Sequence, residues 1–161
     1  MADVDEIDRK ILGQLIENSK MQSKELSRKL KIHPNTLLQR LKKLEKADVI
    51  KRYSAVVDFN KVEHRMQCII FLDIKMIKGW EKVLRPLAHL PQVESFILIS
   101  GNHDVVVIAR VKNEFELAEL MRRLQDNDVV EHTTTHIIVD YYKQPYEYNP
   151  IIDDVQRFSK R

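Results

Sequence analysis

The sequence has a single cysteine, no long apolar run and no signal-peptide pattern. One thiol, Cys68, excludes an intrachain disulfide framework and a thiolate-rich metal site. No apolar run approaches the roughly 20 residues that a membrane span requires, so we expect no membrane partner. Residues 1–6 are acidic and lack the basic-then-apolar order of a signal peptide. These absences predict a cytoplasmic protein.

What is present is a globular composition with an uneven distribution of charge. A chain of 161 residues is long enough for one ordinary domain or two small ones. Residues 1–53 hold 13 Lys/Arg against 8 Asp/Glu, whereas residues 54–161 hold 14 against 16. The net charge of +3 therefore conceals a basic first third, which favours a polyanionic partner for that part of the chain.

The residues after Pro34 predict a helix with one apolar and one polar face. Leu37, Leu41 and Leu44 recur at helical spacing, with Leu38 at the margin, and are expected to be buried. The opposite face carries amides and cations, flanked by further polar groups: Asn35, Gln39, Lys42 and Lys46, then Thr36, Arg40 and Lys43.

The start of this helix also carries a signal. Pro34 suits a first helical position, because its missing N–H would have no helical partner there. His33 is then the expected N-cap, although it is a weaker cap than Ser or Asp.

A helix face of amides, hydroxyls and cations matches what the major groove of DNA requires. Amides can pair with adenine edges, and cations with guanine or phosphate. The alternative is a lysine-rich helix that is merely solvated. The candidate DNA-binding residues are His33, Asn35, Thr36, Gln39, Arg40, Lys42, Lys43, Lys51 and Arg52.

The flanking residues predict a winged helix-turn-helix over residues 1–53. A first helix capped by Asp5, with Asp8 in its first turn, presents apolar residues at helical spacing. A second helix is expected to begin with Ser23 as its cap. Residues 49–57 switch to an extended pattern, from which we expect a short strand pair. Tyr53 fits either a wing or a packing residue between domains.

Beyond a linker at residues 54–65, the order of elements predicts a ferredoxin-like βαββαβ domain over residues 66–142, and thus an α+β protein. The expected strands span 66–76, 93–100, 104–111 and 129–142. A helix starts at Gly79 and is shortened by Pro86, and another spans 113–126 with a capping box of Asn113 and Glu116.

One face of the predicted sheet would lack a helical cover, and we expect it to pair two copies sheet to sheet as a homodimer. Two recognition helices one groove-turn apart then fit a palindromic site in double-stranded DNA. The uncovered face takes whichever alternate set points away from the helices among Ile69, Phe71, Phe96, Leu98, Val106 and Ile108.

Several segments of the first third resemble the DNA-binding half of the Lrp/AsnC (feast/famine) transcription regulators. They are Asp5-Glu-Ile-Asp-Arg-Lys-Ile-Leu, Lys24-Glu-Leu-Ser, Thr36-Leu-Leu-Gln-Arg-Leu-Lys-Lys-Leu-Glu and Val49-Ile-Lys-Arg-Tyr-Ser-Ala. The sequence departs from the family where His33 replaces Ser, which weakens the cap. Asp48 replaces Gly, which bears on the local backbone geometry.

The second half resembles the amino-acid-sensing domain of the same family. Leu90-Pro-Gln-Val-Glu, a Gly-x-x-Asp turn and a Thr-x-Thr strand appear in family order. The resemblance implies a free amino-acid effector bound between dimers, no cofactor, and assembly into a homodimer and further into a tetramer or octamer. The alternative for the turn is a simple tight hairpin. The implied effector-binding residues are Gly101, Asn102, His103, Asp104, Thr133 and Thr135.

Other interpretations stay open. His132 and His136 share a strand face, where a metal is less expected than ordinary exposed histidines, and we predict no metal and no catalytic residue. The tail, residues 143–161, either docks a short helix beginning at Asn149-Pro150 on a neighbouring subunit or is disordered. The alternative functions are a siroheme-decarboxylase-like enzyme of the same two-domain layout and an architectural DNA-binding protein of low specificity.

Overall fold

The computed structural model describes residues 4–62 and 66–151. The chain divides into two compact units: residues 1–56, grouped with the segment that begins at Lys143, and residues 57–142. Within the described ranges, no helix is both long and apolar enough to cross a membrane.

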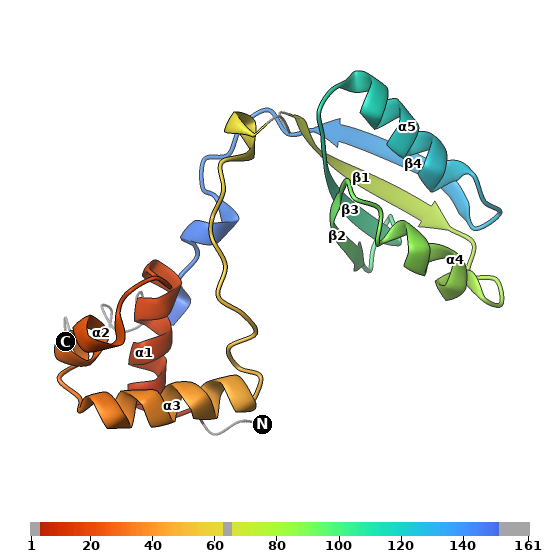
Figure 1. The fold of residues 1–161 in the computed structure, drawn as a ribbon. Coiled ribbons are helices and arrows are strands. Elements are labelled where there is room, and N and C mark those ends of the chain that lie inside the picture. The colour runs from red at the N-terminus through yellow and green to blue at the C-terminus, as the bar shows by residue number, and fades with distance from the viewer. Residues whose placement is uncertain (1–3, 63–65, 152–161) are drawn as a thin grey trace. The chain divides into compact units, whose positions relative to one another are not determined.

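Residues 4–56 of the first unit form three helices, α1 (Glu6–Glu17), α2 (Ser23–Leu30) and α3 (Pro34–Lys46) (Figure 1). Their apolar faces meet in a small core whose fully buried members are Ile11, Leu26, Leu37 and Leu44, with Leu41 and Leu30 packed against it. The apolar stripe predicted for α3 is therefore confirmed, and Leu38 lies at its margin with 45% of its surface exposed.

Two of the three helix starts predicted for this unit are confirmed. The Asp5 side chain accepts from the Asp8 N–H at 2.8 Å, and the two residues form a reciprocal capping box. His33 Nδ1 accepts from the Asn35 N–H at 3.2 Å, with Pro34 as the first helical residue.

The cap predicted for α2 is wrong. Ser23 is already the first helical residue, and the extended residue before it is Gln22, which makes no side-chain cap hydrogen bond. The helix thus begins one residue earlier than expected. This moves the Ser23 hydroxyl out of the N-cap position, from which it would reach the amides of the first turn.

The strand pair expected after α3 is also absent. Residues 51–57 are exposed and extended, and among the described residues all strands belong to one four-stranded sheet in the second unit. A strand is defined by hydrogen bonds to a neighbouring strand, and residues 51–57 have none. The helix-turn-helix is present, followed by an extended segment where we expected a paired wing.

The second unit has the predicted βαββαβ order. Its elements are β1 (Met66–Ile74), α4 (Trp80–Leu87), β2 (Val93–Leu98), β3 (Val105–Val111), α5 (Glu114–Gln125) and β4 (Val130–Ile137). The strands form one antiparallel sheet in the order β2-β3-β1-β4. Both helices lie on the same face of this sheet (Figure 1).

Alternation along the strands decides which residues face the helices. Cys68, Ile70 and Leu72 of β1 are fully buried, whereas Ile69 and Phe71 between them remain partly accessible. Phe96 and Leu98 pair with Val107 and Val105 of the buried set, so they lie on the helical side. The uncovered face therefore carries Ile69, Phe71, Ile97, Val106 and Ile108.

The last strand is shorter than predicted. β4 pairs only with β1, and Ile137 is opposite Cys68 near the start of β1. The Ile138 N–H still donates to the Gln67 carbonyl at 2.8 Å, but β1 begins one residue before Gln67. Within the described residues, 139–142 consequently have no strand alongside them to continue the ladder.

Candidate nucleic-acid interface and ligand site

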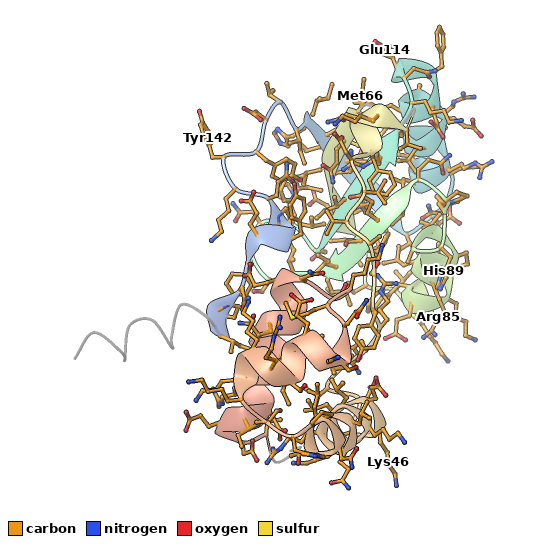
Figure 2. All side chains as sticks on the ribbon, turned by 60° about the vertical axis from the view of Figure 1, so that its left-hand side comes forward. Lys46, Met66, Arg85, His89, Glu114 and Tyr142 are labelled. Carbon is orange, nitrogen blue, oxygen red and sulfur yellow. The ribbon has the colours of Figure 1, made fainter. Side chains whose placement is uncertain are left out.

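The predicted recognition face of α3 is exposed. Asn35, Gln39, Lys42 and Lys46 all lie at the surface on one side of the helix, and Figure 2 shows Lys46 projecting outward at its end. His33 is exposed beside them and Thr36 is half-buried at the flank. The amides and ammonium groups that we expected to meet base edges are therefore free of the protein core.

The flank of α3 that faces α1 carries an ion-pair network. One guanidinium nitrogen of Arg40 lies 2.6 Å from Asp5 Oδ2 and 2.8 Å from Asp8 Oδ1. Lys43 Nζ lies 3.2 Å from Asp8 Oδ2, and the Asp8 side chain is fully buried. Two predicted DNA-binding cations, Arg40 and Lys43, thus have carboxylate partners within the protein.

The network changes the acidity of its members. Burial alone would raise the pKa of Asp8, but hydrogen bonds from Arg40, Lys43 and the Asp5 N–H outweigh it and lower the pKa below its usual value. The Arg40 guanidinium likewise lowers the pKa of Asp5. Asp8 therefore stays charged inside the helical unit, a role that we missed when we assigned it only to the first turn of α1.

The other flank of α3 meets the extended segment that follows. The Tyr53 hydroxyl donates to Glu45 Oε1 at 2.9 Å, and burial together with this carboxylate raises the pKa of Tyr53 to about 12. Asp48 adopts a left-handed backbone with φ of 58° and pairs with Lys51. Lys51 and Arg52, which follow α3 in the sequence, are both exposed.

The Gly-x-x-Asp turn is tied to the end of β1. Asp104 Oδ2 accepts from the Ile74 N–H at 2.8 Å, and the Asp104 N–H donates to the Leu72 carbonyl at 3.1 Å. Gly101 takes the left-handed φ of 128° that the hairpin requires, and Asn102 is exposed next to it. The carboxylate that we expected to hold an ammonium group also has a structural role.

The histidine of this turn lies on the uncovered sheet face. His103 Nδ1 is 2.7 Å from Asp73 Oδ1, and its ring packs on Phe71 at 4.9 Å between centroids. His136 meets the same ring edge-on at 5.8 Å, while His132 is opposite Asp73 in the neighbouring strand. No group of three or more metal-ligating side chains occurs in the part of the chain that the structure describes.

The two threonines point to the other side of the sheet. Thr133 and Thr135 pair with Leu72 and Ile70, so their side chains lie toward α5. Thr133 Oγ1 accepts from Gln125 Nε2 at 2.8 Å, and the Thr135 hydroxyl donates to the Met121 sulfur at 3.2 Å. Asp104 and Thr133 both adjoin Leu72, but they lie on opposite sides of β1. Two strand spacings therefore separate their backbones, a distance of about 10 Å.

A recess that we did not predict lies between α4 and β2. It has a volume of about 330 Å³ and combines an apolar floor with one acid and one base. A helical period in α4 combined with alternation in β2 could have indicated it. The lining residues are Trp80, Glu81, Leu84, Arg85, Ala88, Phe96 and Leu98.

Comparison with known families assigns both units. Residues 4–51 match a family described as winged helix-turn-helix DNA-binding, and residues 68–148 match the Lrp/AsnC ligand binding domain. The chain belongs to the Lrp/AsnC family. As a Lrp/AsnC protein it is a transcriptional regulator with a DNA-binding helix-turn-helix and a ligand-binding domain. These matches point to a family of regulators and not to an enzyme.

The similarity to individual relatives covers almost the whole of this Lrp/AsnC chain. The uncharacterized HTH-type transcriptional regulator YugG of Bacillus subtilis is 31% identical over 157 residues, which cover 94% of this chain and 95% of YugG. The transcriptional regulator NMB0573 of Neisseria meningitidis, solved as an L-Met complex, superposes with a TM-score of 0.84 at 24% identity, covering 88% of this chain and 94% of that one. The feast or famine regulatory protein Rv3291c of M. tuberculosis, complexed with L-methionine, has a TM-score of 0.81 at 22% identity and coverages of 92% and 100%.

Proposed function

We propose that this regulator recognises a specific DNA site through the exposed face of α3, and that a free amino acid bound by the second unit changes its DNA affinity or assembly. The observation that carries the first part is the single exposed surface formed by Asn35, Gln39 and Lys42, directly opposite the buried leucine stripe. Side chains so placed can enter a major groove without unpacking the helical core.

Each group on this face has a suited partner in DNA. The carboxamides of Asn35 and Gln39 can form bidentate hydrogen bonds with adenine, and the Lys42 ammonium suits guanine or phosphate. His33, Thr36, Lys51 and Arg52 flank this face in the sequence and suit contacts to the DNA backbone, which fix register without reading bases. Arg40 and Lys43 lie at the flank, already engaged by α1.

The proposed assembly rests on the uncovered sheet face. Ile69, Phe71, Val106 and Ile108 form an apolar surface in one unit, with Ile97 at its edge 44% exposed. Burying such a surface against a second copy removes apolar area from water, and each Å² buried stabilises the dimer by about 25 cal/mol. A homodimer formed in this way presents two α3 helices to a palindromic site, and tetramers or octamers would add further half-sites.

For the effector we propose a free amino acid near the turn at residues 101–104. NMB0573 and Rv3291c were solved with L-methionine, which makes methionine the first candidate. The negative charge of Asp104 suits the ammonium group, and the exposed backbone around Gly101 and Asn102 suits the carboxylate. Thr133 and Thr135 lie on β4 with their side chains toward α5, on the other face of the sheet from His103. The effector acts on DNA affinity only through different affinities for two states of the protein.

Footprinting upstream of the protein's own gene, with each free amino acid added in turn, tests both parts. We expect the protein to protect a palindromic site. One amino acid, with methionine as the first candidate, should change the extent of the protected region or the protein concentration at half-protection. Equal protection of random DNA at all salt concentrations would instead favour the architectural alternative.

A charge-only variant tests the effector site. Asp104→Asn keeps an oxygen that can accept from the Ile74 N–H but removes the charge, so we expect unchanged DNA binding and loss of the amino-acid response. Arg85→Ala, in the recess between α4 and β2, is the matched control and should leave the response intact. Loss of response in Arg85→Ala with a normal response in Asp104→Asn would place the effector in that recess and refute the proposed site.

A further inference from the structure

We propose that Asp8 is a specificity-determining residue, because its buried carboxylate holds Arg40 and Lys43 against the first turn of α1 and withholds two cations from the DNA backbone. This inference rests on the proposed use of α3 as the recognition helix. It goes beyond that proposal by assigning a function to a residue that has no contact with DNA.

The geometry places this network at the border of the recognition face. Arg40 and Lys43 are three residues apart on α3, on the flank between the buried leucines and the exposed Gln39 and Lys42. The Arg40 side chain is only 23% exposed and that of Lys43 is half-exposed, whereas Asp8 is 0% exposed. The cations therefore point toward α1 at the edge of the surface that would face DNA.

The burial of Asp8 determines the direction of the effect. A phosphate that captured Arg40 and Lys43 would leave a charged carboxylate unpaired in the interior, which is strongly unfavourable. The two cations are therefore much less available to phosphate than exposed cations such as Lys42 and Arg52. Asp5 strengthens this hold, because it also accepts from Arg40 and its backbone N–H donates to Asp8 at 3.3 Å.

The consequence is a larger difference between specific and non-specific binding. Cation–phosphate contacts supply the affinity that does not depend on sequence, whereas base contacts supply the difference between sites. Holding two cations back lowers the sequence-independent affinity and leaves the base contacts proposed for Asn35 and Gln39 unchanged.

The test is the salt dependence of binding to a short random-sequence duplex, measured with the full chain. Each additional phosphate contact steepens the fall of log K with log salt by about 0.9. We expect Asp8→Asn to steepen this slope by about 0.9 to 1.8 and to raise random-sequence affinity about tenfold for each cation released at 0.1 M salt. The slope is a suitable readout because a loss of folded protein changes the apparent affinity but not the slope.

Glu6→Gln is the matched control. It removes one negative charge from the same helix turn, but Glu6 is exposed and pairs with Lys10 rather than with α3. We expect its slope to equal that of the wild type. A slope for Asp8→Asn that equals that of Glu6→Gln would overturn the proposal, whatever the stability of the variant.

A second pair of variants tests the proposal without changing Asp8. Arg40→Met should leave the wild-type slope unchanged, because Arg40 is held by Asp5 and Asp8 and not by phosphate. A slope shallower by about 0.9 in Arg40→Met would overturn the role of Asp8. The slope for Lys42→Ala should be shallower than that of the wild type by about 0.9. An unchanged slope for this variant would count against the proposed recognition face and not against the role of Asp8.

Discussion

The side-chain amide of Asn149 donates to the carbonyl oxygen of Gly13 at 2.9 Å, and it lies 2.8 Å from Glu17 Oε1. Asn149 is only 7% exposed, so the segment that begins at Lys143 packs against α1 at this residue. From the sequence we expected the tail either to dock on a neighbouring subunit or to be disordered. Pro150 and Ile151 are helical, and the rest of the expected short helix lies outside the described residues.

Asn149→Ala should destabilise the helical unit. The variant loses two hydrogen bonds from a buried amide, one of them to a carboxylate, and we expect the free energy of unfolding to fall by about 1–3 kcal/mol. Urea unfolding followed by helical circular dichroism measures this. Tyr148→Ala is the control, because Tyr148 is 65% exposed beside it. Equal stability of the two variants would show that the contact contributes nothing.

Asp48→Gly should stabilise the end of α3. Asp48 has a φ of 58°, a conformation that is strained for a residue with a side chain and free of strain for glycine. The exposed pair with Lys51 contributes little, so we expect a net gain of about 0.5–1 kcal/mol in the free energy of unfolding. Asp48→Ala, which lacks both the pair and the freedom of glycine, should be less stable than the wild type. A glycine variant no more stable than the alanine variant would exclude backbone strain at this position.

Gln39→Ala should relax sequence preference at one base pair. Loss of a bidentate contact is expected to reduce discrimination there by about 1–3 kcal/mol, while random DNA binds as before. Competition between single-substituted operator fragments measures the loss position by position. Lys46→Ala, one turn beyond Lys42 on the same face, is the comparison, and should weaken all sequences alike if it meets phosphate. Unchanged discrimination in Gln39→Ala would remove this residue from the base-contacting set.

Acid should destabilise the helical unit partly through Asp8. The pKa of Asp8 is lower in the folded state than its ordinary 3.8, so the unfolded chain binds the proton more readily. The resulting stability is fully present above pH 3.8 and is lost as the pH falls through the lower folded value. Thermal unfolding of the wild type and Asp8→Asn across this window measures the difference. A steeper acid loss in the variant would have the wrong sign and refute this linkage.

Much of the fold was predictable because it depends on local patterns. Leucines at helical spacing predicted the buried face of α3, and Asp5, His33 and Asn113 predicted three helix starts, since a cap acts within its own first turn. The order of strands and helices predicted the ferredoxin-like unit, whose sheet order is β2-β3-β1-β4. The exposed face of α3 followed directly from the position of its buried stripe.

One error, the cap of α2, is local, and the others concern partners that are distant in the sequence. No local pattern shows that β4 stops where β1 begins or that residues 51–57 find no strand, and none shows that Thr133 faces α5. The positions of the DNA and effector residues as binding sites stay predictions.

The sequence by itself determined most of the helices and strands and the exposed polar face of α3, because periodicity and capping are properties of neighbouring residues. Only the tertiary structure decided which cations on that helix are paired with carboxylates of α1 and which are exposed. Arg40 and Lys42 differ little in a list of basic residues, yet one meets a buried carboxylate 32 positions away and the other meets solvent. An ion pair depends on the distance between its charges in space, and folding sets that distance.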